Sequence, residues 1–209
     1  MLNPFAEISE KNKRKLLRQL EAHTIFYKKK DIVNAMFKDD NYIGIIVSGM
    51  VQINKADYNG NISIVDELQE NELFSTNINI DNKNTDIIAQ EDSEIIILNY
   101  DYLLRNINSD KVYFNKFIKN MFLIFNEKIK EKNERIEILS KKTIREKLLC
   151  YFDIERNKHG SKFIYLPFNF KDLAAYLAID RTAMSRELKY LKEEGFIEVN
   201  NKKITLINR

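Results

Sequence analysis

The stretch LAIDRTAMSREL, residues 177–188, has the pattern of a capped amphipathic helix. Asp180 is a residue type that caps helices, because its carboxylate accepts hydrogen bonds from the free N–H groups of the first turn. Met184, Leu188 and Leu191 follow at helical spacing, which predicts that they form a buried stripe. The polar side chains on the other face must then point outward, and they are Arg181, Thr182, Ser185 and Arg186.

The residues around this helix complete a larger motif. Leu173 and Leu177 mark a short preceding helix, and Ala178-Ile179 form the turn between the two helices. Gly195 ends the second helix, since glycine readily takes the left-handed conformation found after helix ends. The segment FIEVNNKKITLI, residues 196–207, predicts a two-stranded hairpin. Helix, tight turn, helix and β-ribbon together predict a winged helix-turn-helix.

The polar face of the second helix is typical of a surface that reads DNA. In a helix-turn-helix this helix enters the major groove with its N-terminal residues at the base edges. Arginine suits the acceptor atoms of guanine, serine and threonine contact bases or phosphates, and lysines such as Lys192 reach phosphates. The predicted DNA-binding residues are Arg181, Thr182, Ser185, Arg186, Lys189, Lys202 and Lys203.

The charge distribution supports a polyanionic partner for this part of the chain. The net charge of the 209 residues is only +3, from 34 basic and 31 acidic residues. Residues 141–209 hold 15 of the basic and 9 of the acidic residues, which leaves 19 and 22 for residues 1–140. The C-terminal third is therefore basic, with a net charge of +6, and the remainder is acidic, with a net charge of −3.

Residues 24–98 have the texture of β-structure. Short runs rich in isoleucine, valine and tyrosine alternate with turn residues, such as the segment DYNGN at 57–61. Gly60 in that segment predicts a hairpin turn with a positive φ. Many short strands at this spacing indicate a sandwich or a barrel.

Residues 110–139 predict a long helix, because neither glycine nor proline interrupts them. Apolar residues repeat there at alternating spacings of four and three, as in a coiled coil, with Lys132 as a polar member. A helix of about 30 residues spans roughly 45 Å, which is longer than a domain of this size buries alone. We therefore predict a homodimer; the alternative is a helix packed wholly on its own β-domain. The predicted dimerisation residues are Ile118, Phe122, Phe125, Ile129, Ile136 and Leu139.

The composition restricts the class of protein. With 44% hydrophobic and 31% charged residues, the chain has enough apolar residues for a core and enough charge for solubility. No apolar run approaches the roughly 18 residues of a membrane helix, and the N-terminus lacks a signal-peptide pattern, so we expect a cytoplasmic protein without membrane contact. The single cysteine, Cys150, excludes an internal disulfide, and its apolar helical setting predicts a small buried side chain.

In this order of segments the chain resembles the CRP/FNR family of bacterial transcription regulators. Residues 42–53, YIGIIVSGMVQI, are similar to the family's β-roll, with Gly49 at its glycine turn. Residues 144–152, IREKLLCYF, are similar to the helix that enters the family's DNA-binding domain. Residues 172–197, DLAAYLAIDRTAMSRELKYLKEEGFI, are similar to its helix-turn-helix, which is the most specific of the three likenesses.

The resemblance implies an α+β fold in three parts. These are a jelly-roll, the cyclic-nucleotide-binding-like β-roll sensor, at 1–109, a dimerisation helix at 110–139, and a winged helix-turn-helix domain at 140–209. It implies DNA as the partner of a homodimer, and RNA polymerase as a further partner.

The resemblance also distinguishes residues within the helix-turn-helix. Ser185 and Arg186 match positions that contact bases in the family, whereas Thr182 stands where members often have glutamate. A glutamate accepts from a cytosine amine, and threonine does not impose the same choice. The family's usual half-site is therefore not carried over to this chain.

The sensor segment departs from the cyclic-nucleotide-binding members of the family. Those members hold the cyclic phosphate with a Gly-Glu-Leu turn followed by an Arg-Ser/Thr pair. In residues 71–89 here, Asn71 replaces the glycine, Glu72 remains, and Lys83 lies near the arginine position as a point charge. The resemblance leaves Glu72 and Lys83 as effector-binding candidates and argues against a cyclic nucleotide. The effector and any cofactor stay unknown, and some relatives respond to no small molecule.

Two alternative functions stay open. A haem-dependent gas or redox sensor of the same family would need an axial ligand, for which His23 is the candidate; one cysteine cannot hold an iron–sulfur cluster. A ligand-binding signalling module that does not bind DNA would lack the steep salt dependence of DNA binding.

Neither an enzyme nor a metal site is expected. There is no phosphate-binding glycine loop, and His23 and His159 lie far apart in the sequence. The sequence predicts a sequence-specific DNA-binding transcription regulator with an effector-sensing or regulatory β-roll, and leaves activation or repression open.

Overall fold

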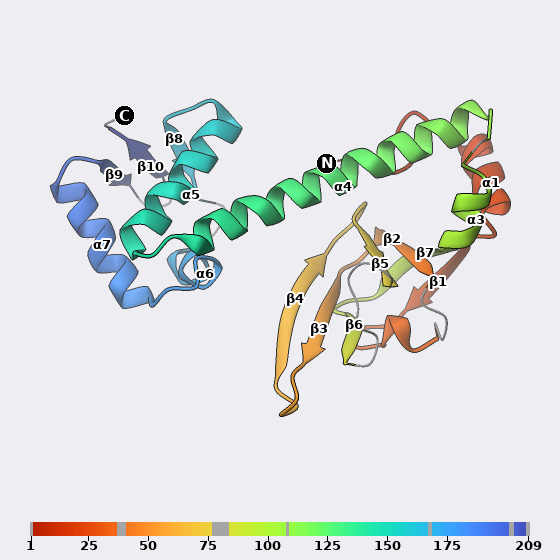
Figure 1. Cartoon of the computed structure of the whole chain (residues 1–209), viewed down its shortest axis with the longest axis horizontal. Coiled ribbons are helices and arrows are strands. Elements are labelled where there is room, and N and C mark those ends of the chain that lie inside the picture. Colours follow the sequence, from red (N-terminus) through yellow and green to blue (C-terminus); the bar gives the residue numbers. More distant parts are fainter. Residues whose placement is uncertain are drawn as a thin grey trace. The chain divides into compact units, whose positions relative to one another are not determined.

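The computed structural model describes residues 2–36, 41–76, 84–107, 109–166, 169–200 and 203–207. The chain divides into two compact units, Met1–Asn126 and Glu127–Arg209, and the division falls within one long helix (Figure 1). Strands dominate the first unit, and helices with a small sheet form the second, which confirms the predicted α+β class.

The described strands of the first unit form two antiparallel sheets, with the orders β1-β7-β2-β5 and β4-β3-β6. A 3-10 turn, η1 (Val33–Met36), lies between the first two strands in the sequence. The strands are β1 (His23–Tyr27), β2 (Tyr42–Ser48), β3 (Val51–Ala56), β4 (Ile62–Leu68), β5 (Leu73–Ser75), β6 (Thr85–Ala89) and β7 (Ser93–Asn99). The predicted β-rich texture is confirmed, whereas β5 is too short to show a periodic pattern in the sequence.

The larger sheet is buried on both of its faces. Along β7, Ile95 and Ile97 belong to the core shared with the smaller sheet, while Ile96 and Leu98 belong to a second core shared with helices. Because successive residues of a strand point to opposite faces, both sets must be apolar. This explains why β7 is an unbroken apolar run in the sequence rather than an alternating one.

Helices cover one face of the larger sheet in the first unit. They are α1 (Glu10–Gln19), α3 (Tyr100–Arg105) and the start of α4 (Val112–Ser140), for which the sequence predicts residues 110–139. Ser9 caps α1 by accepting a hydrogen bond from the Asn12 backbone N–H at 3.4 Å. Phe114 and Phe117 of α4 are fully buried in the core that they share with α1.

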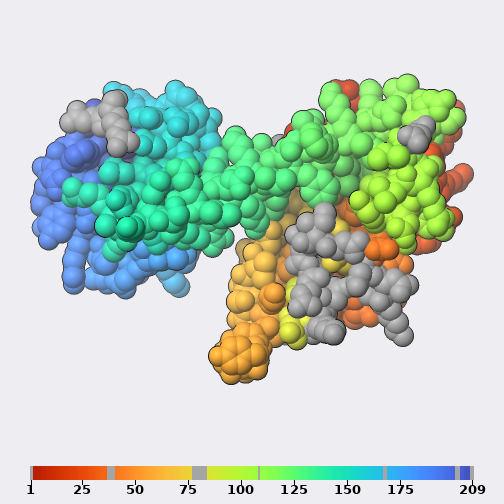
Figure 2. All heavy atoms as spheres, viewed as in Figure 1, coloured from red at the N-terminus to blue at the C-terminus, as the bar shows by residue number. Residues whose placement is uncertain are grey.

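The hairpin of β3 and β4 turns at Asp57–Asn61, as predicted. The Asp57 carboxylate accepts backbone hydrogen bonds from Asn59 at 2.8 Å and from Asn61 at 2.9 Å. Gly60 has a φ of +82°, which glycine adopts without steric cost. The tip of the hairpin, coloured orange in Figure 2, protrudes from the surface of the first unit.

The second unit contains the end of α4 and a winged helix-turn-helix. Its further elements are α5 (Ile144–His159), β8 (Phe163–Tyr165), α6 (Phe170–Tyr176), α7 (Arg181–Glu193), β9 (Ile197–Asn200) and β10 (Lys203–Leu206). The sheet has the order β8-β10-β9. The antiparallel pair of β9 and β10 confirms the predicted two-stranded hairpin, and β8 pairs with the other edge of β10 as a third strand.

A capping box fixes the start of α5, which three residues separate from the end of α4. The Thr143 hydroxyl accepts from the backbone N–H of Glu146 at 3.1 Å, and the Glu146 carboxylate accepts from the backbone N–H of Thr143 at 3.0 Å. This reciprocal pair satisfies two N–H groups that an uncapped helix would leave free. The turn between α4 and α5 is thus held by local hydrogen bonds.

Within the described ranges, none of the helices combines the length and the apolar character that a bilayer crossing requires.

The glycine turn between β2 and β3 generates a stability prediction. Gly49 has a φ of +88°, and a Cβ there would lie 2.7 Å from the Asp92 carbonyl oxygen and 2.7 Å from Ser93 Cα. We expect Gly49→Ala to destabilise the protein by more than about 2 kcal/mol, because backbone clash adds to the strain of a left-handed alanine. Chemical denaturation followed by circular dichroism measures the loss.

The matched control is Gly60→Ala. Gly60 has a similar φ of +82° but no atom within 4 Å of the added Cβ, so only the conformational strain of about 1–2 kcal/mol is expected. Equal losses for the two variants would contradict the clash at Gly49.

Candidate nucleic-acid interface

The turn between α6 and α7 sets the direction of the second helix. The backbone N–H of Ile179 donates to the Ala174 carbonyl at 3.0 Å, so the chain folds back over the end of α6. Ala178 in this turn has a φ of +51°, a conformation that glycine takes more easily than alanine. The Asp180 carboxylate accepts from the backbone N–H of Ala183 at 2.8 Å, which confirms the predicted cap.

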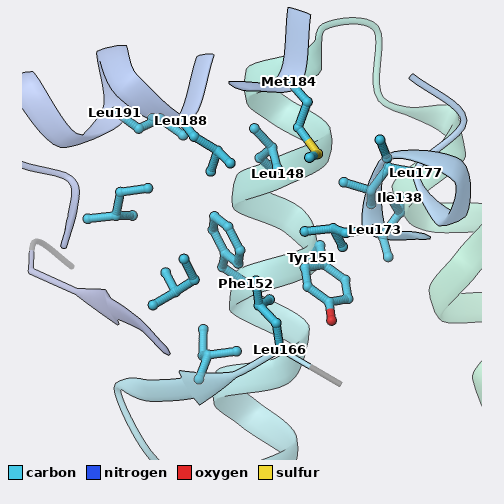
Figure 3. Packing of buried hydrophobic residues seen from close by; sticks show 14 residues of the cluster. Ile138, Leu148, Tyr151, Phe152, Leu166, Leu173, Leu177, Met184, Leu188 and Leu191 are labelled. Atoms are coloured by element: carbon cyan, nitrogen blue, oxygen red, sulfur yellow. The ribbon is translucent and has the colours of Figure 1, made fainter. Parts of the chain in front are cut away.

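One side of α7 is buried in the core of the second unit. Met184 and Leu191 are completely buried and Leu188 is nearly so, which confirms the predicted stripe. Figure 3 shows Leu148 of α5 between Met184 and Leu188, with Phe152 one turn further along α5. Burial of a large apolar side chain contributes about 1.5–3 kcal/mol. The rotation of α7 about its own axis is therefore fixed by this stripe.

The opposite side of α7 is exposed. Arg181, Thr182, Ser185 and Arg186 are all accessible to solvent, as predicted. Within the described part of the chain, neither arginine forms an ion pair. The Ser185 hydroxyl donates to the Arg181 carbonyl oxygen at 3.0 Å, so in this rotamer it offers lone pairs rather than a proton. The exposed face thus presents two free guanidinium groups and two hydroxyl groups.

The predicted phosphate-contacting lysines differ in how free they are. Lys189 lies 3.6 Å from the Glu193 carboxylate, but both side chains are mostly exposed, so this pair contributes little. Lys192 is exposed. The ammonium of Lys203 lies 4.2 Å from the centre of the Phe163 ring on β8, a cation–π contact that half-buries the side chain. Lys202 lies outside the described residues.

An ion-pair network that the sequence analysis missed holds α7 against α5. Arg145 in the first turn of α5 contacts the carboxylates of Glu187 and Glu194. Hydrogen bonds from Arg145 lower the pKa of Glu194, so that carboxylate stays ionised at neutral pH. No sequence signal marks the network, because Glu187 and Glu194 lie 42 and 49 residues from Arg145.

Of the two effector-binding candidates, only Glu72 lies within the described residues. Asn71 has a φ of +67°, so it keeps the left-handed turn for which relatives use glycine. The Glu72 carboxylate accepts from the backbone N–H of Gln69 at 2.8 Å, and the Glu72 carbonyl accepts from Ile46 at 3.0 Å. Glu72 therefore serves to close this turn. Lys83 lies outside the described residues.

The remaining candidates for redox or metal chemistry are scattered. His23 is exposed at the start of β1, where it pairs with Ile97 of β7. Among the residues that the structure describes, no three histidine, cysteine, aspartate or glutamate side chains are grouped as a metal site would require.

The prediction of a buried Cys150 is wrong in degree. The side chain is half-buried, because it lies at the edge of the core rather than within it. Its sulfur lies 3.6 Å from a carboxylate oxygen of Glu137 on α4. Desolvation, and then the Glu137 charge, raise the pKa of the thiol, so it is mainly protonated at neutral pH.

Each of the two units contains a match to a known family of protein domains. A cyclic nucleotide-binding domain model matches residues 17–110, and a Crp-like helix-turn-helix domain model matches residues 147–209. No curated protein sequence matches the chain.

Several solved structures share the fold. A CooA mutant from Carboxydothermus hydrogenoformans is 22% identical, with a TM-score of 0.57 over 93% of this chain and 86% of that one. The Catabolite Activator Protein of Thermus thermophilus is 17% identical, with a TM-score of 0.51 over 97% and 92%. CprK complexed with OCPA is 15% identical, with a TM-score of 0.64 over 93% and 92%.

The two matched domains, in this order, define a DNA-binding transcription regulator with an effector-sensing domain. The chain belongs to the CRP/FNR family of transcription regulators, as the resemblance in its sequence indicated.

The strained turn of the helix-turn-helix leads to a second stability prediction. Ala178 is exposed and has a positive φ, so Ala178→Gly removes strain and loses no buried contact. We expect a net stabilisation of about 0.5–1 kcal/mol, because the relief exceeds the entropy cost of glycine. Thermal unfolding measures it.

Ala175→Gly is the matched control for this effect. Ala175 is also exposed but lies within α6, so glycine there should cost about 1 kcal/mol. The two substitutions should therefore have opposite signs, and destabilisation by both would contradict the strain at Ala178.

Proposed function

We propose that the protein acts as a homodimer in which the two α7 helices read a palindromic DNA site. The observation that carries the proposal is the pair of faces that the chain leaves uncovered. One is the polar, cationic face of α7, and the other is an apolar stripe along α4.

The apolar stripe of α4 has the spacing of a coiled-coil seam. Phe122, Ile129 and Ile136 are seven residues apart, and their side chains are 64%, 57% and 63% exposed. Leu139 on the same seam is 38% exposed. Large apolar side chains at this spacing are what a second helix covers in a dimer. A second copy of α4 supplies a cover of matching spacing, since each copy carries the same stripe.

The other members of the predicted seam are less exposed. Ile118 and Phe125 are half-buried, because they also pack against the core of the first unit. Lys132 is half-buried too, and it takes part in a polar or electrostatic contact within the chain. In the proposed dimer this lysine sets the register of the seam rather than its strength.

The exposed face of α7 suits direct reading of bases. Arg181 and Arg186 are free to donate to guanine acceptors, and Ser185 accepts or donates at a base edge or phosphate. Thr182 takes the position of the family's glutamate, so the proposed half-site differs from the usual one. Lys189 and Lys192 contact phosphates, and in a dimer the two α7 helices lie about 34 Å apart, one turn of DNA.

The first unit is proposed to regulate this binding. The turn from Ser140 to Thr143 separates α4 from α5, so it is the proposed hinge between DNA-competent and incompetent arrangements. An effector acts by binding one arrangement more tightly than the other. The complex of CprK with OCPA supports a ligand-binding role for the fold. A bacterial regulator that binds the chromosome works in the cytoplasm. There the DNA-bound dimer would contact RNA polymerase.

The dimer is tested by placing a charge in the seam. Ile129→Glu should convert the dimer to a monomer at micromolar concentration, because it puts a carboxylate into an apolar interface. Sedimentation equilibrium measures the molecular mass. Lys130→Glu is the control, since the seam spacing places position 130 outside the interface. A wild-type protein that is monomeric at micromolar concentration would exclude the proposed dimer.

Base reading is tested with Arg186→Ala on a site obtained by binding selection with the purified protein. Loss of a two-pronged arginine–guanine contact should reduce affinity for that site about 5- to 150-fold, and reduce non-specific affinity much less. Fluorescence anisotropy across a salt series measures both affinities.

Lys192→Ala serves as the comparison variant. As a phosphate contact it should weaken binding to all DNA alike and lower the salt dependence by about one unit of slope. Unchanged binding by Arg186→Ala would rule out the assignment of α7 as the base-reading helix.

A further inference from the structure

Arg145 uses all three of its guanidinium nitrogens on α7. Its Nε donates to Glu187 Oε1 at 2.6 Å. Its Nη1 and Nη2 donate to the two oxygens of Glu194 at 2.8 Å and 2.6 Å. The Glu194 contact is two-pronged, which is the strong and directional form of an ion pair. One side chain of α5 therefore holds two carboxylates of α7.

The two carboxylates hold α7 at separate points along its length. Glu187 lies in the middle of the helix and Glu194 is its C-terminal cap residue. Seven residues correspond to about two turns, or roughly 10 Å along the axis. A contact at a single point would leave the helix free to tilt, whereas two points two turns apart restrict its tilt as well as its rotation.

The apolar stripe of α7, from Met184 to Leu191, also spans two turns and limits tilt, but its contacts have no fixed directions. Met184, Leu188 and Leu191 fix which side faces the core, but close-packed apolar contacts are not directional. The Arg145 network adds fixed donor and acceptor directions at the edge of that core. Its three side chains are 37%, 21% and 44% exposed, so solvent screens the contact only in part.

The network also controls the charge next to the DNA-facing residues. Glu187 follows Arg186 directly in the sequence. Without Arg145, its carboxylate would repel phosphates or compete with DNA for the free arginines. Arg145 occupies Glu187 and leaves Arg186 without an ion-pair partner among the described residues.

We propose that Arg145 is a positioning residue for DNA reading, which holds α7 at the tilt that Arg181 and Arg186 need to reach the base edges. The inference rests on the proposed role of α7. Arg145 lies two residues after Thr143, the cap of α5, so it also joins the orientation of α7 to the turn that follows α4. A movement of that turn is then transmitted to α7 through the guanidinium.

The decisive variant is Arg145→Lys, which keeps the positive charge but loses the guanidinium group that donates to both Glu187 and Glu194. An ammonium group is a single donor centre and cannot hold both carboxylates in fixed directions. We expect the ratio of specific to non-specific affinity to fall about tenfold, while the salt dependence of binding stays unchanged because no phosphate contact is lost. Fluorescence anisotropy with the selected site and a scrambled duplex gives both affinities.

Arg156→Gln is the control on the same helix. Arg156 pairs with Asp153 of its own helix at 3.4 Å, so this variant loses a positive charge without touching α7. It should leave the affinity ratio unchanged. Glu194→Gln, which weakens only the two-pronged half of the network, should lower the ratio less than Arg145→Lys. The double variant Arg145→Lys/Glu194→Gln should have the same ratio of specific to non-specific affinity as Arg145→Lys alone, because the two substitutions remove the same contact.

The outcomes separate this inference from the proposed function. The positioning role is wrong if Arg145→Lys keeps the wild-type ratio of specific to non-specific affinity. It is also wrong if both affinities fall by the same factor and the melting temperature falls with them, because the network is then only structural. If Arg145→Lys does not fold, Glu194→Gln decides by the same ratio. If Arg186→Ala leaves binding unchanged, the base-reading role of α7 fails first. Loss of specificity in Arg186→Ala but not in Arg145→Lys overturns the present inference alone.

Discussion

The burial of one side of α7 against α5 is the constraint on which the DNA-binding unit depends. Once Met184 and Leu188 pack around Leu148, the polar residues of the same helix have no place in the core. They must lie on the surface, and their types make that surface cationic and rich in hydrogen-bonding groups. The exposed polar face is therefore a consequence of core packing, since the same stripe that stabilises the fold also directs Arg181 and Arg186 outward.

The first unit meets a different constraint, because its larger sheet needs apolar cover on both faces. The smaller sheet covers one face, and α1 with the first turns of α4 covers the other. Phe114 and Phe117 are buried in this core, whereas Phe122, Ile129 and Ile136 further along α4 are exposed. The N-terminal part of α4 thus packs in the core of the first unit, whereas its later turns carry an exposed apolar stripe. The proposed dimer would cover that stripe with the same helix of a second copy.

Directional contacts complete what apolar packing begins. Apolar burial fixes which face of a helix points inward, but it tolerates small rotations and tilts. The capping box at Thr143, the cap at Asp180 and the Arg145 fork each add hydrogen bonds of defined geometry. They lie at the start of α5 and at both ends of α7, where an error in angle would move Arg181 and Arg186 most.

The elements whose signals are local or periodic could be predicted from the order of the residues alone. The cap Asp180, the turn at Gly60, the heptad spacing of α4 and the buried stripe of α7 all depend on residues within a few positions of one another. Such signals survive without knowledge of the fold, because caps, turns and helix faces are set by backbone geometry. The family resemblance followed from the order of these elements.

The contacts between distant segments could not be predicted and became known from the three-dimensional packing. It placed β8 beside β10, put Lys203 over Phe163, left Cys150 half-buried, and joined Arg145 to carboxylates 42 and 49 residues away. It also gave Ala178 a positive φ, which its residue type does not favour. The spacing of residues along the chain does not predict such pairings, because they depend on how whole elements pack against each other.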